Sequence, residues 1–153
     1  MIEEDKDQSV VQIEALLRDV STIIRKRGRD ILSDFDVTPP QFDALLALRD
    51  GGELTMGELC QRMYLACSTA TDLIDRMERN RLILRERDAT DRRVIRLKMT
   101  EKGQNVIKEV LLARKRYLSA VLVHVEPDAR EKLIQSLTQL YSLMTRDVQV
   151  VNR

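Results

Sequence analysis

Apolar residues recur at three- and four-residue steps through the first part of the chain, which is the period of an amphipathic helix. The first such run spans residues 8–35, and its apolar members are Ile13, Leu16, Leu17, Val20, Ile23, Ile24, Ile31 and Leu32. The segment DVTPPQF at residues 36–42 ends this helix, because proline disfavours helical backbone in the residue before it. Thr38 and Gln41 have the spacing of a capping box, with Pro39 at the first helical position. A second helix is therefore expected to begin there.

Two short helices separated by a tight turn follow. Glycines at residues 51 and 52 end the second helix, and Thr55 with Glu58 makes another capping box that opens a third. A turn at about residues 64–67 separates it from a fourth helix at residues 68–79, whose apolar face consists of Ala70, Leu73, Ile74 and Met77. Two helices joined by so short a turn are typical of a helix-turn-helix.

The hydrophobic period changes to two after residue 80, which indicates strands. Residues 82–87 (LILRER) and 94–99 (VIRLKM) flank a polar tip, DATDRR. Arg96 and Lys98 alternate with apolar neighbours, so one face of the second strand is expected to pack on the core and the other to be exposed to solvent. We expect a two-stranded hairpin. A hairpin directly after a helix-turn-helix predicts a winged helix-turn-helix over residues 38–100, with its second helix in the major groove of DNA.

Two long amphipathic helices complete the chain. Thr100 caps the first, VEPDA interrupts it, and the second begins at about residue 127. The predicted fold is mainly α with a small β-hairpin (α+β), a single domain over residues 1–153. A winged domain needs roughly 70 to 90 residues, so the apolar stripes of residues 8–36 and 101–149 are left over. These helices are expected to form a homodimer whose recognition helices lie about 34 Å apart, one duplex turn.

The composition excludes several classes of protein. No apolar run reaches the roughly 20 residues that span a bilayer, and the N-terminal MIEEDKDQ is acidic, unlike a signal peptide, so we expect no membrane partner and a cytoplasmic protein. His124 is the only histidine, and Cys60 and Cys67 are the only cysteines. A Cys/His metal site or a Ser-His-Asp triad has little to be built from. With no glycine-rich phosphate loop either, the chain is not expected to be an enzyme or to carry a cofactor or metal.

Positive charge is concentrated around the predicted hairpin. Residues 76–96 hold eight arginines against Glu78, Glu86, Asp88 and Asp91, a local balance of +4 in a chain whose net charge is +1. Such charge suits the phosphates of double-stranded DNA, and arginine in particular enters narrow minor grooves. The alternatives are a solvated charged hairpin, or a winged-helix module that docks on an acidic protein.

A helical wheel places polar residues opposite the apolar face of the fourth helix. The residues expected to contact DNA are Ser68, Thr69, Thr71, Asp72, Arg76 and Arg79 on this helix, and Arg85, Arg87, Arg92 and Arg93 on the hairpin. Hydroxyls and free amides at a helix N-terminus suit phosphates or base edges. Asp72 either accepts a hydrogen bond from a cytosine amino group or pairs with an arginine. Asp75 is expected to brace an arginine of the wing.

The run STATDLIDRMERNRLILRERDATDRRVIRLKMTEKG at residues 68–103 resembles the signature region of the multiple antibiotic resistance regulator (MarR) family, and the order of helices agrees over nearly the whole chain. The most specific pieces are LIDRM, DRR and MTEKG. The resemblance implies a homodimeric transcription regulator, in most cases a repressor, on a pseudo-palindromic operator. It also implies that Arg92 or Arg93 probes the minor groove while Asp91 braces the wing, and that a small anionic or phenolic effector releases the DNA.

Two positions depart from the family pattern. Asp72 stands where the family commonly has arginine, which puts operator preference in doubt. Asn80 and Arg81 stand where it usually has glycine, and Asn80 is the better suited of the two to a left-handed helix cap. Some members respond to thiol oxidation, and a redox-sensing regulator is a further alternative. Cys67 is the candidate, because a helix N-terminus favours a thiolate. Redox-responsive members of the family usually carry their reactive cysteine in the first helix, where this chain has none.

Overall fold

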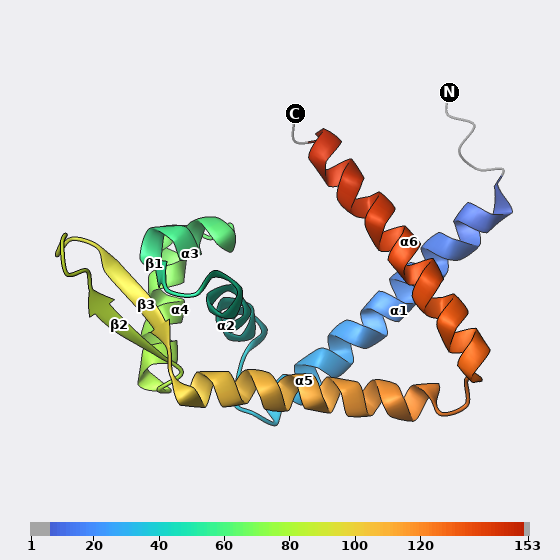
Figure 1. The fold of residues 1–153 in the computed structure, drawn as a ribbon, viewed down its shortest axis with the longest axis horizontal. Coiled ribbons are helices and arrows are strands. Elements are labelled where there is room, and N and C mark those ends of the chain that lie inside the picture. The colour runs from blue at the N-terminus through green and yellow to red at the C-terminus, as the bar shows by residue number, and fades with distance from the viewer. Residues whose placement is uncertain (1–6, 152–153) are drawn as a thin grey trace. The chain divides into compact units, whose positions relative to one another are not determined.

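The computed structural model describes residues 7–151, with side chains through residue 146. It consists of two compact units, divided after Arg114 within helix α5. The first unit contains, in chain order, α1 (Gln8–Ser33), α2 (Pro39–Gly51), β1 (Leu54–Thr55), α3 (Met56–Arg62), α4 (Cys67–Arg79), β2 (Ile83–Arg87), β3 (Ile95–Met99) and the beginning of α5 (Glu101–Leu122) (Figure 1). The second contains the rest of α5 and α6 (Pro127–Val151). The predicted class, helices with a small antiparallel sheet, is confirmed.

The predicted capping boxes form and set where α2 and α3 begin. Thr38 Oγ1 accepts from the Gln41 amide at 3.4 Å, and Gln41 Oε1 accepts from the Thr38 amide at 3.1 Å. Thr55 and Glu58 make the same reciprocal pair, with both distances 3.2 Å. Each box satisfies two amides that a helix N-terminus would otherwise leave without a partner. The lengths of α2 and α3, and hence the place of the turn before α4, follow from these caps.

The end of α4 differs from the expectation. The Leu82 amide donates to the Met77 carbonyl at 3.0 Å, which is the long bond of a Schellman motif. Arg81, with φ 59°, occupies its left-handed position, whereas Asn80 has φ −81°. The expectation that Asn80 takes this position is wrong. Met77 and Leu82 are both buried, and the hydrophobic contact between these two positions of the motif fixes the turn one residue later.

The sheet has three strands in the order β1-β3-β2, where the sequence predicted a two-stranded hairpin. The hairpin itself pairs as expected, from Ile83 opposite Met99 to Arg87 opposite Ile95. The additional strand, β1, pairs antiparallel with β3 and places Leu54 opposite Leu97. A strand of two residues is too short to show an alternating pattern, which is why the sequence did not reveal it.

The core of the first unit is aliphatic and lies beneath α4 and the sheet. Its largest fully buried side chains are Phe42, Leu45, Leu48, Leu59, Ile74, Met77, Leu82, Ile83, Leu97 and Val110. The start of α5 packs closely on the root of the hairpin. Thr100 Oγ1 accepts from the Gly103 amide at 3.1 Å and so caps the helix. A Cβ at residue 103 would lie only 2.4 Å from the Leu82 carbonyl oxygen. Glycine at residue 103 is therefore required by close approach.

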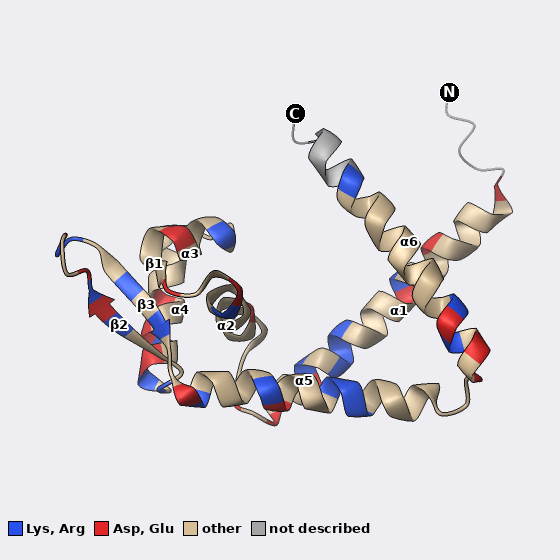
Figure 2. Ribbon diagram, in the orientation of Figure 1, with Lys and Arg blue, Asp and Glu red and all other residues tan. Residues whose placement is uncertain are grey.

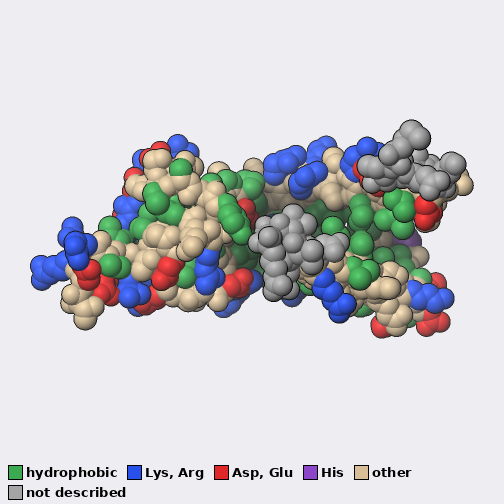
Figure 3. Space-filling view, turned by 90° about the horizontal axis from the view of Figure 1, so that it is seen from above, with side chains coloured by type: hydrophobic (Ala, Val, Ile, Leu, Met, Phe, Trp, Pro, Cys, Tyr) green, Lys and Arg blue, Asp and Glu red, His purple; other side chains and the backbone are tan. Residues whose placement is uncertain are grey.

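Other helices expose their apolar residues. On α1 these are Val10, Val11, Ile13, Leu16, Leu17, Val20, Ile23 and Ile24, and on α6 they are Leu133, Ile134, Leu137, Tyr141, Leu143 and Met144. Figure 3 shows hydrophobic side chains at the surface of the helices as well as over the winged part. Even so, no helix within the described residues is long and apolar enough to span a membrane.

Candidate nucleic-acid interface

Helix α4 buries one face and presents a polar one. Ala70, Ile74 and Met77 are fully buried, whereas the predicted contact residues Ser68, Thr69, Thr71, Asp72, Arg76 and Arg79 are all exposed. At its N-terminus Ala66 provides no side-chain cap, so the first amides of the helix are left to another hydrogen-bond acceptor. A phosphate oxygen is the kind of acceptor that helix N-termini bind.

Asp75 is half-buried, unlike the exposed polar residues of α4. Its carboxylate accepts from the Arg85 guanidinium at 2.5 Å, as expected for a residue that braces a wing arginine. Glu78 adds to this contact, because its Oε2 accepts from the Arg85 amide at 3.2 Å. The Arg85 side chain is only 26% exposed. Arg85 therefore ties β2 to α4, and this position does not favour the DNA contact that the sequence suggested for it.

Asp72 is the other acidic residue of this helix, and it is exposed. No lysine or arginine among the described residues pairs with it. Of the two alternatives that the sequence left open, pairing with an arginine of the same chain is thus not observed. The polar face of α4 carries a carboxylate that is available to a hydrogen-bond donor.

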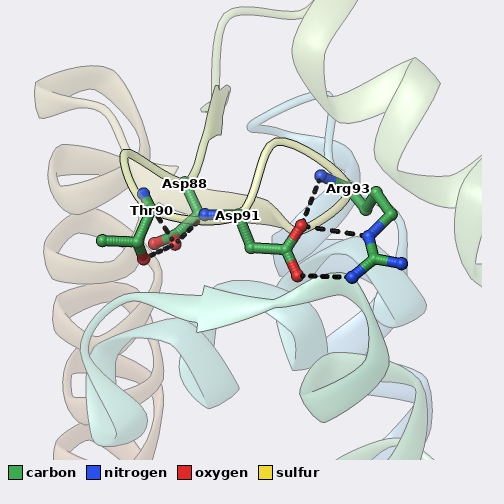
Figure 4. Close-up of polar contacts among 4 residues, drawn as sticks. All are labelled: Asp88, Thr90, Asp91 and Arg93. Carbon is green, nitrogen blue, oxygen red and sulfur yellow. Dashed lines mark hydrogen bonds and ion pairs between the residues drawn. The ribbon is translucent and has the colours of Figure 1, made fainter.

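The tip of the hairpin is organised around Asp88, a residue that the sequence pattern did not mark as part of the site (Figure 4). One carboxylate oxygen accepts from the Thr90 hydroxyl at 2.6 Å and from the amides of Thr90 and Asp91 at 3.2 and 3.0 Å. The other accepts from Arg96 Nε at 2.7 Å. These bonds, the Thr90 hydroxyl first and Arg96 next, hold the pKa of Asp88 well below its usual range. The signal in the sequence is the Asp-Ala-Thr-Asp turn, because aspartate readily hydrogen-bonds amides two and three residues ahead.

Asp91 orients one of the two adjacent arginines at the tip. Its Oδ1 accepts from the Arg93 amide at 3.1 Å and from Arg93 Nε at 3.2 Å, and Arg93 lowers the pKa of this carboxyl (Figure 4). The Arg93 side chain nonetheless stays 91% exposed. Arg92 is also exposed and has no carboxylate partner within the described part of the chain. The tip thus presents one braced arginine beside one unpaired arginine.

Ion pairs divide the arginines of this region into two groups. Arg85, Arg93 and Arg96 have carboxylate partners. Among the described residues, those without one are Arg76, Arg79, Arg81, Arg87 and Arg92. Figure 2 shows the basic residues of the hairpin along β3 and at the tip, and Figure 3 shows basic side chains at the hairpin end of the first unit. The arginines without a carboxylate partner therefore lie on α4, in the turn after it, at the end of β2 and at the tip.

No group of histidine, cysteine, aspartate or glutamate residues in the described ranges could hold a metal ion. The helix-turn-helix, the three-stranded sheet with its basic tip and the polar face of α4 define a winged helix-turn-helix protein. A family model described as "MarR family" matches residues 35–94. The chain belongs to the MarR family, as the following relatives show.

An HTH-type transcriptional regulator of Bacillus subtilis, YsmB, is 48% identical over 111 residues, which are 72% of this chain and 76% of that one. The HTH-type transcriptional repressor MdtR of the same organism is 35% identical over 117 residues, 74% of this chain and 76% of that one. A solved MarR family protein from Bacillus stearothermophilus superposes with a TM-score of 0.81 at 43% identity, covering 92% of this chain and 98% of that one. The protein is accordingly a DNA-binding transcription regulator and not an enzyme.

Proposed function

We propose that the protein is a sequence-specific repressor that binds a pseudo-palindromic operator in double-stranded DNA as a homodimer. The observation that carries this proposal is the exposed polar face of α4 together with the wing tip, where Asp88 organises the turn and Asp91 holds Arg93. A face that is polar, uncapped at its start and next to an ordered basic loop matches a helix placed in the major groove with a wing over the adjacent backbone.

Within the major groove, α4 supplies both positioning and specificity. Its uncapped N-terminus, with Ser68 and Thr69, binds phosphate, while Arg76 and Arg79 contact phosphates or base edges further along the helix. Asp72 lacks a cation in the described chain and would be repelled by phosphates. We assign it to the exocyclic amino group of cytosine, the base-edge donor that carboxylates accept.

The wing supplies the minor-groove contact. Arg92 is the unpaired, exposed arginine at the tip, and it is the residue assigned to the groove. Arg93, held at its Nε by Asp91, presents its guanidinium to the flanking phosphates. Arg87, exposed on β2, adds a further cation on the same hairpin. Arg85 is assigned no DNA contact of its own. It orients the wing, because its ion pair with Asp75 sets the angle of the hairpin to α4.

Dimerisation is supported by the apolar residues that the chain leaves uncovered. Ile13, Leu16 and Ile24 on α1 are 51%, 63% and 60% exposed, and Leu137 and Tyr141 on α6 are 54% and 71% exposed. Exposed apolar stripes of this length mark protein interaction sites. A second copy of the same helices covers them and gives the two-fold symmetry that a palindromic operator requires. Repression is supported by MdtR, which is named as a repressor.

A small-molecule effector has a candidate place in the first unit. A cavity of about 440 Å³ lies between the end of α2, β3 and the start of α5. Leu48, Met99 and Ile107 give it apolar walls. Its charged lining is Arg49, Lys98 and Lys108 against Glu53, which pairs with Lys98, and the net positive charge suits an anionic amphipathic compound. Occupancy there would act on the root of the hairpin, because β3 continues directly into the wing.

Selection of bound fragments from the source genome tests the proposal, combined with sedimentation of the protein alone and on a selected fragment. We expect a small set of fragments that share an inverted repeat, and two chains per repeat. Equal retention of all fragments, or a monomer on the selected site, contradicts the proposal. Retention of no duplex even at low salt would instead favour a protein-interaction module.

A further inference from the structure

The short turn that joins α3 to α4 carries a tyrosine that is almost wholly exposed (Figure 1). Tyr64 is 96% exposed, the highest value among the large apolar side chains that the structure describes. Its hydroxyl makes no hydrogen bond within the described residues. Tyrosine rings in folded proteins usually bury much of their surface. Both the ring and the hydroxyl of Tyr64 are therefore available to another molecule.

The backbone of Tyr64 has a conformation that a large side chain seldom adopts. The Leu65 amide donates to the Cys60 carbonyl at 3.1 Å, which is the long bond of a Schellman motif at the end of α3. The Tyr64 amide donates to the Gln61 carbonyl at 3.3 Å, which is the second bond of the motif. Tyr64 takes the left-handed position between them, with φ 53°, where glycine would fit without strain. The tyrosine thus neither fills space in the core nor relaxes the turn, which favours a role in binding over a role in stability.

The turn holds Tyr64 beside the start of α4. Leu59 on α3 and Ala70 on α4 are fully buried, so both helices are anchored on either side of the turn. Ala66, two residues after Tyr64, is the N-cap of α4 and gives the first amides of that helix no side-chain partner. Tyr64 therefore accompanies the helix end that the proposed function places on the DNA backbone.

We propose that Tyr64 is a further DNA-contacting residue, whose hydroxyl donates a hydrogen bond to a phosphate oxygen of the operator and whose ring lies on the adjoining deoxyribose. The proposal rests on the proposed function, because it needs α4 to lie on the duplex. Tyrosine is among the side chains that donate to phosphate oxygens in protein–DNA complexes, and such contacts position the protein without reading the bases.

The chemistry of the phenol separates this contact from those of the arginines. A phenol hydroxyl is a neutral donor, whereas a guanidinium is a cation. Cations that neutralise phosphates release counterions, which makes affinity depend steeply on salt. Loss of the Tyr64 hydroxyl should therefore weaken binding equally at every salt concentration. It should also weaken operator and scrambled duplex by the same factor, because a phosphate is present in both.

Two variants of Tyr64 and one control test the contact. Tyr64→Phe removes only the hydroxyl, and Tyr64→Gly removes the side chain and relaxes the turn. The matched control is Asp36→Gly, because Asp36 is exposed and has the same φ of 53° in the turn after α1. Affinity for operator and for scrambled duplex is measured over a series of salt concentrations, and stability is measured by urea unfolding at one protein concentration.

We expect Tyr64→Phe to bind both duplexes at least about tenfold more weakly than the parent, with the same salt dependence. Tyr64→Gly should bind at least as weakly as Tyr64→Phe and yet unfold at a higher urea concentration than the parent. Asp36→Gly should bind no more weakly than the parent. In operators that each carry one neutral methylphosphonate, one position in each half should weaken the parent and leave Tyr64→Phe unaffected.

Parental affinity in Tyr64→Phe would overturn the proposal, and so would a loss confined to the operator, which would indicate a base contact. A Tyr64→Gly protein that is less stable than the parent would show that the tyrosine supports the fold. Binding by the parent is measured in the same series, so a parent that binds while the variants match it refutes only the Tyr64 contact. A parent that binds no duplex overturns the proposed function and this contact together.

Discussion

The substitution Gly103→Ala tests the packing that joins the wing to α5. A Cβ at residue 103 would lie 2.4 Å from the Leu82 carbonyl oxygen and 2.8 Å from Met99 Cγ. Heavy atoms in contact normally stay about 3.5 Å apart, so the helix and the hairpin root must separate by roughly 1 Å. Neither the carbonyl nor the helix backbone can rotate away as a long side chain could.

The expected loss of stability follows from two opposing contributions. Overpacking of this kind destabilises by about 1–3 kcal/mol, and replacing glycine by alanine inside a helix returns up to about 1 kcal/mol. We expect a net loss of about 1–2 kcal/mol. In urea, with a slope of about 1–3 kcal/mol/M, this lowers the unfolding midpoint by roughly 0.3–2 M.

Gly28→Ala is the matched control, because it makes the same chemical change in another helix. Its Cβ would meet only the Arg114 guanidinium, at 4.0 Å, which is ordinary contact. We expect Gly28→Ala to stabilise by up to about 1 kcal/mol. Both variants are compared with the parent by urea unfolding and far-UV circular dichroism at one protein concentration, because the stability of an oligomer depends on concentration. A Gly103→Ala protein as stable as the parent would refute the packing argument.

Three further predictions concern α4 and the wing. Arg81→Gly relieves a left-handed arginine and should raise stability by about 0.5–1 kcal/mol. Arg79→Gly, two residues earlier at the end of α4, should lower it by about 1 kcal/mol, and equal signs in thermal unfolding would contradict the Schellman assignment. Because the pKa of Asp88 is lowered, its ionised carboxylate stabilises the wing fully at pH values above the ordinary aspartate pKa of about 3.9, and this stabilisation is lost as the pH falls through the lowered pKa. An NMR titration of the Thr90 amide with a midpoint at or above about pH 3.9 would disprove this prediction. Asp72→Ala should bind scrambled duplex more tightly than the parent does. The difference in binding free energy between operator and scrambled duplex should fall by about 1–3 kcal/mol, and an unchanged ratio of the two affinities would exclude a base contact.

Local signals predicted much of the fold. The boundaries of α2 and α3 follow from Thr38 and Thr55, because capping boxes depend on residues three apart in sequence. The hairpin follows from the alternation of Arg96 and Lys98 with apolar neighbours. The sequence pattern did not predict strand β1, because its two residues form a strand only by pairing with β3. The position of Asn80 was misjudged because burial of its neighbours outweighed its own backbone preference.

The candidate site was predicted in its residue types more than in its contacts. Exposure along α4 follows from helical periodicity, so the polar face was recognised correctly. The partner of Arg85 depends on the angle between β2 and α4, which no local pattern specifies, and its ion pair with Asp75 appears only in three dimensions.

The central claim is that the arginine-tipped wing lies on duplex DNA beside α4, and Arg92→Ala combined with Arg93→Ala tests it most directly. The matched control is Lys115→Ala combined with Lys132→Ala, which removes the same charge from exposed positions on α5 and α6. Operator affinity of both proteins and the parent is measured over a series of salt concentrations. The wing variant should bind at least about 100-fold more weakly, with a shallower salt dependence, and the control should match the parent. A folded wing variant that binds the operator as tightly as the parent at the same salt concentration would contradict the claim.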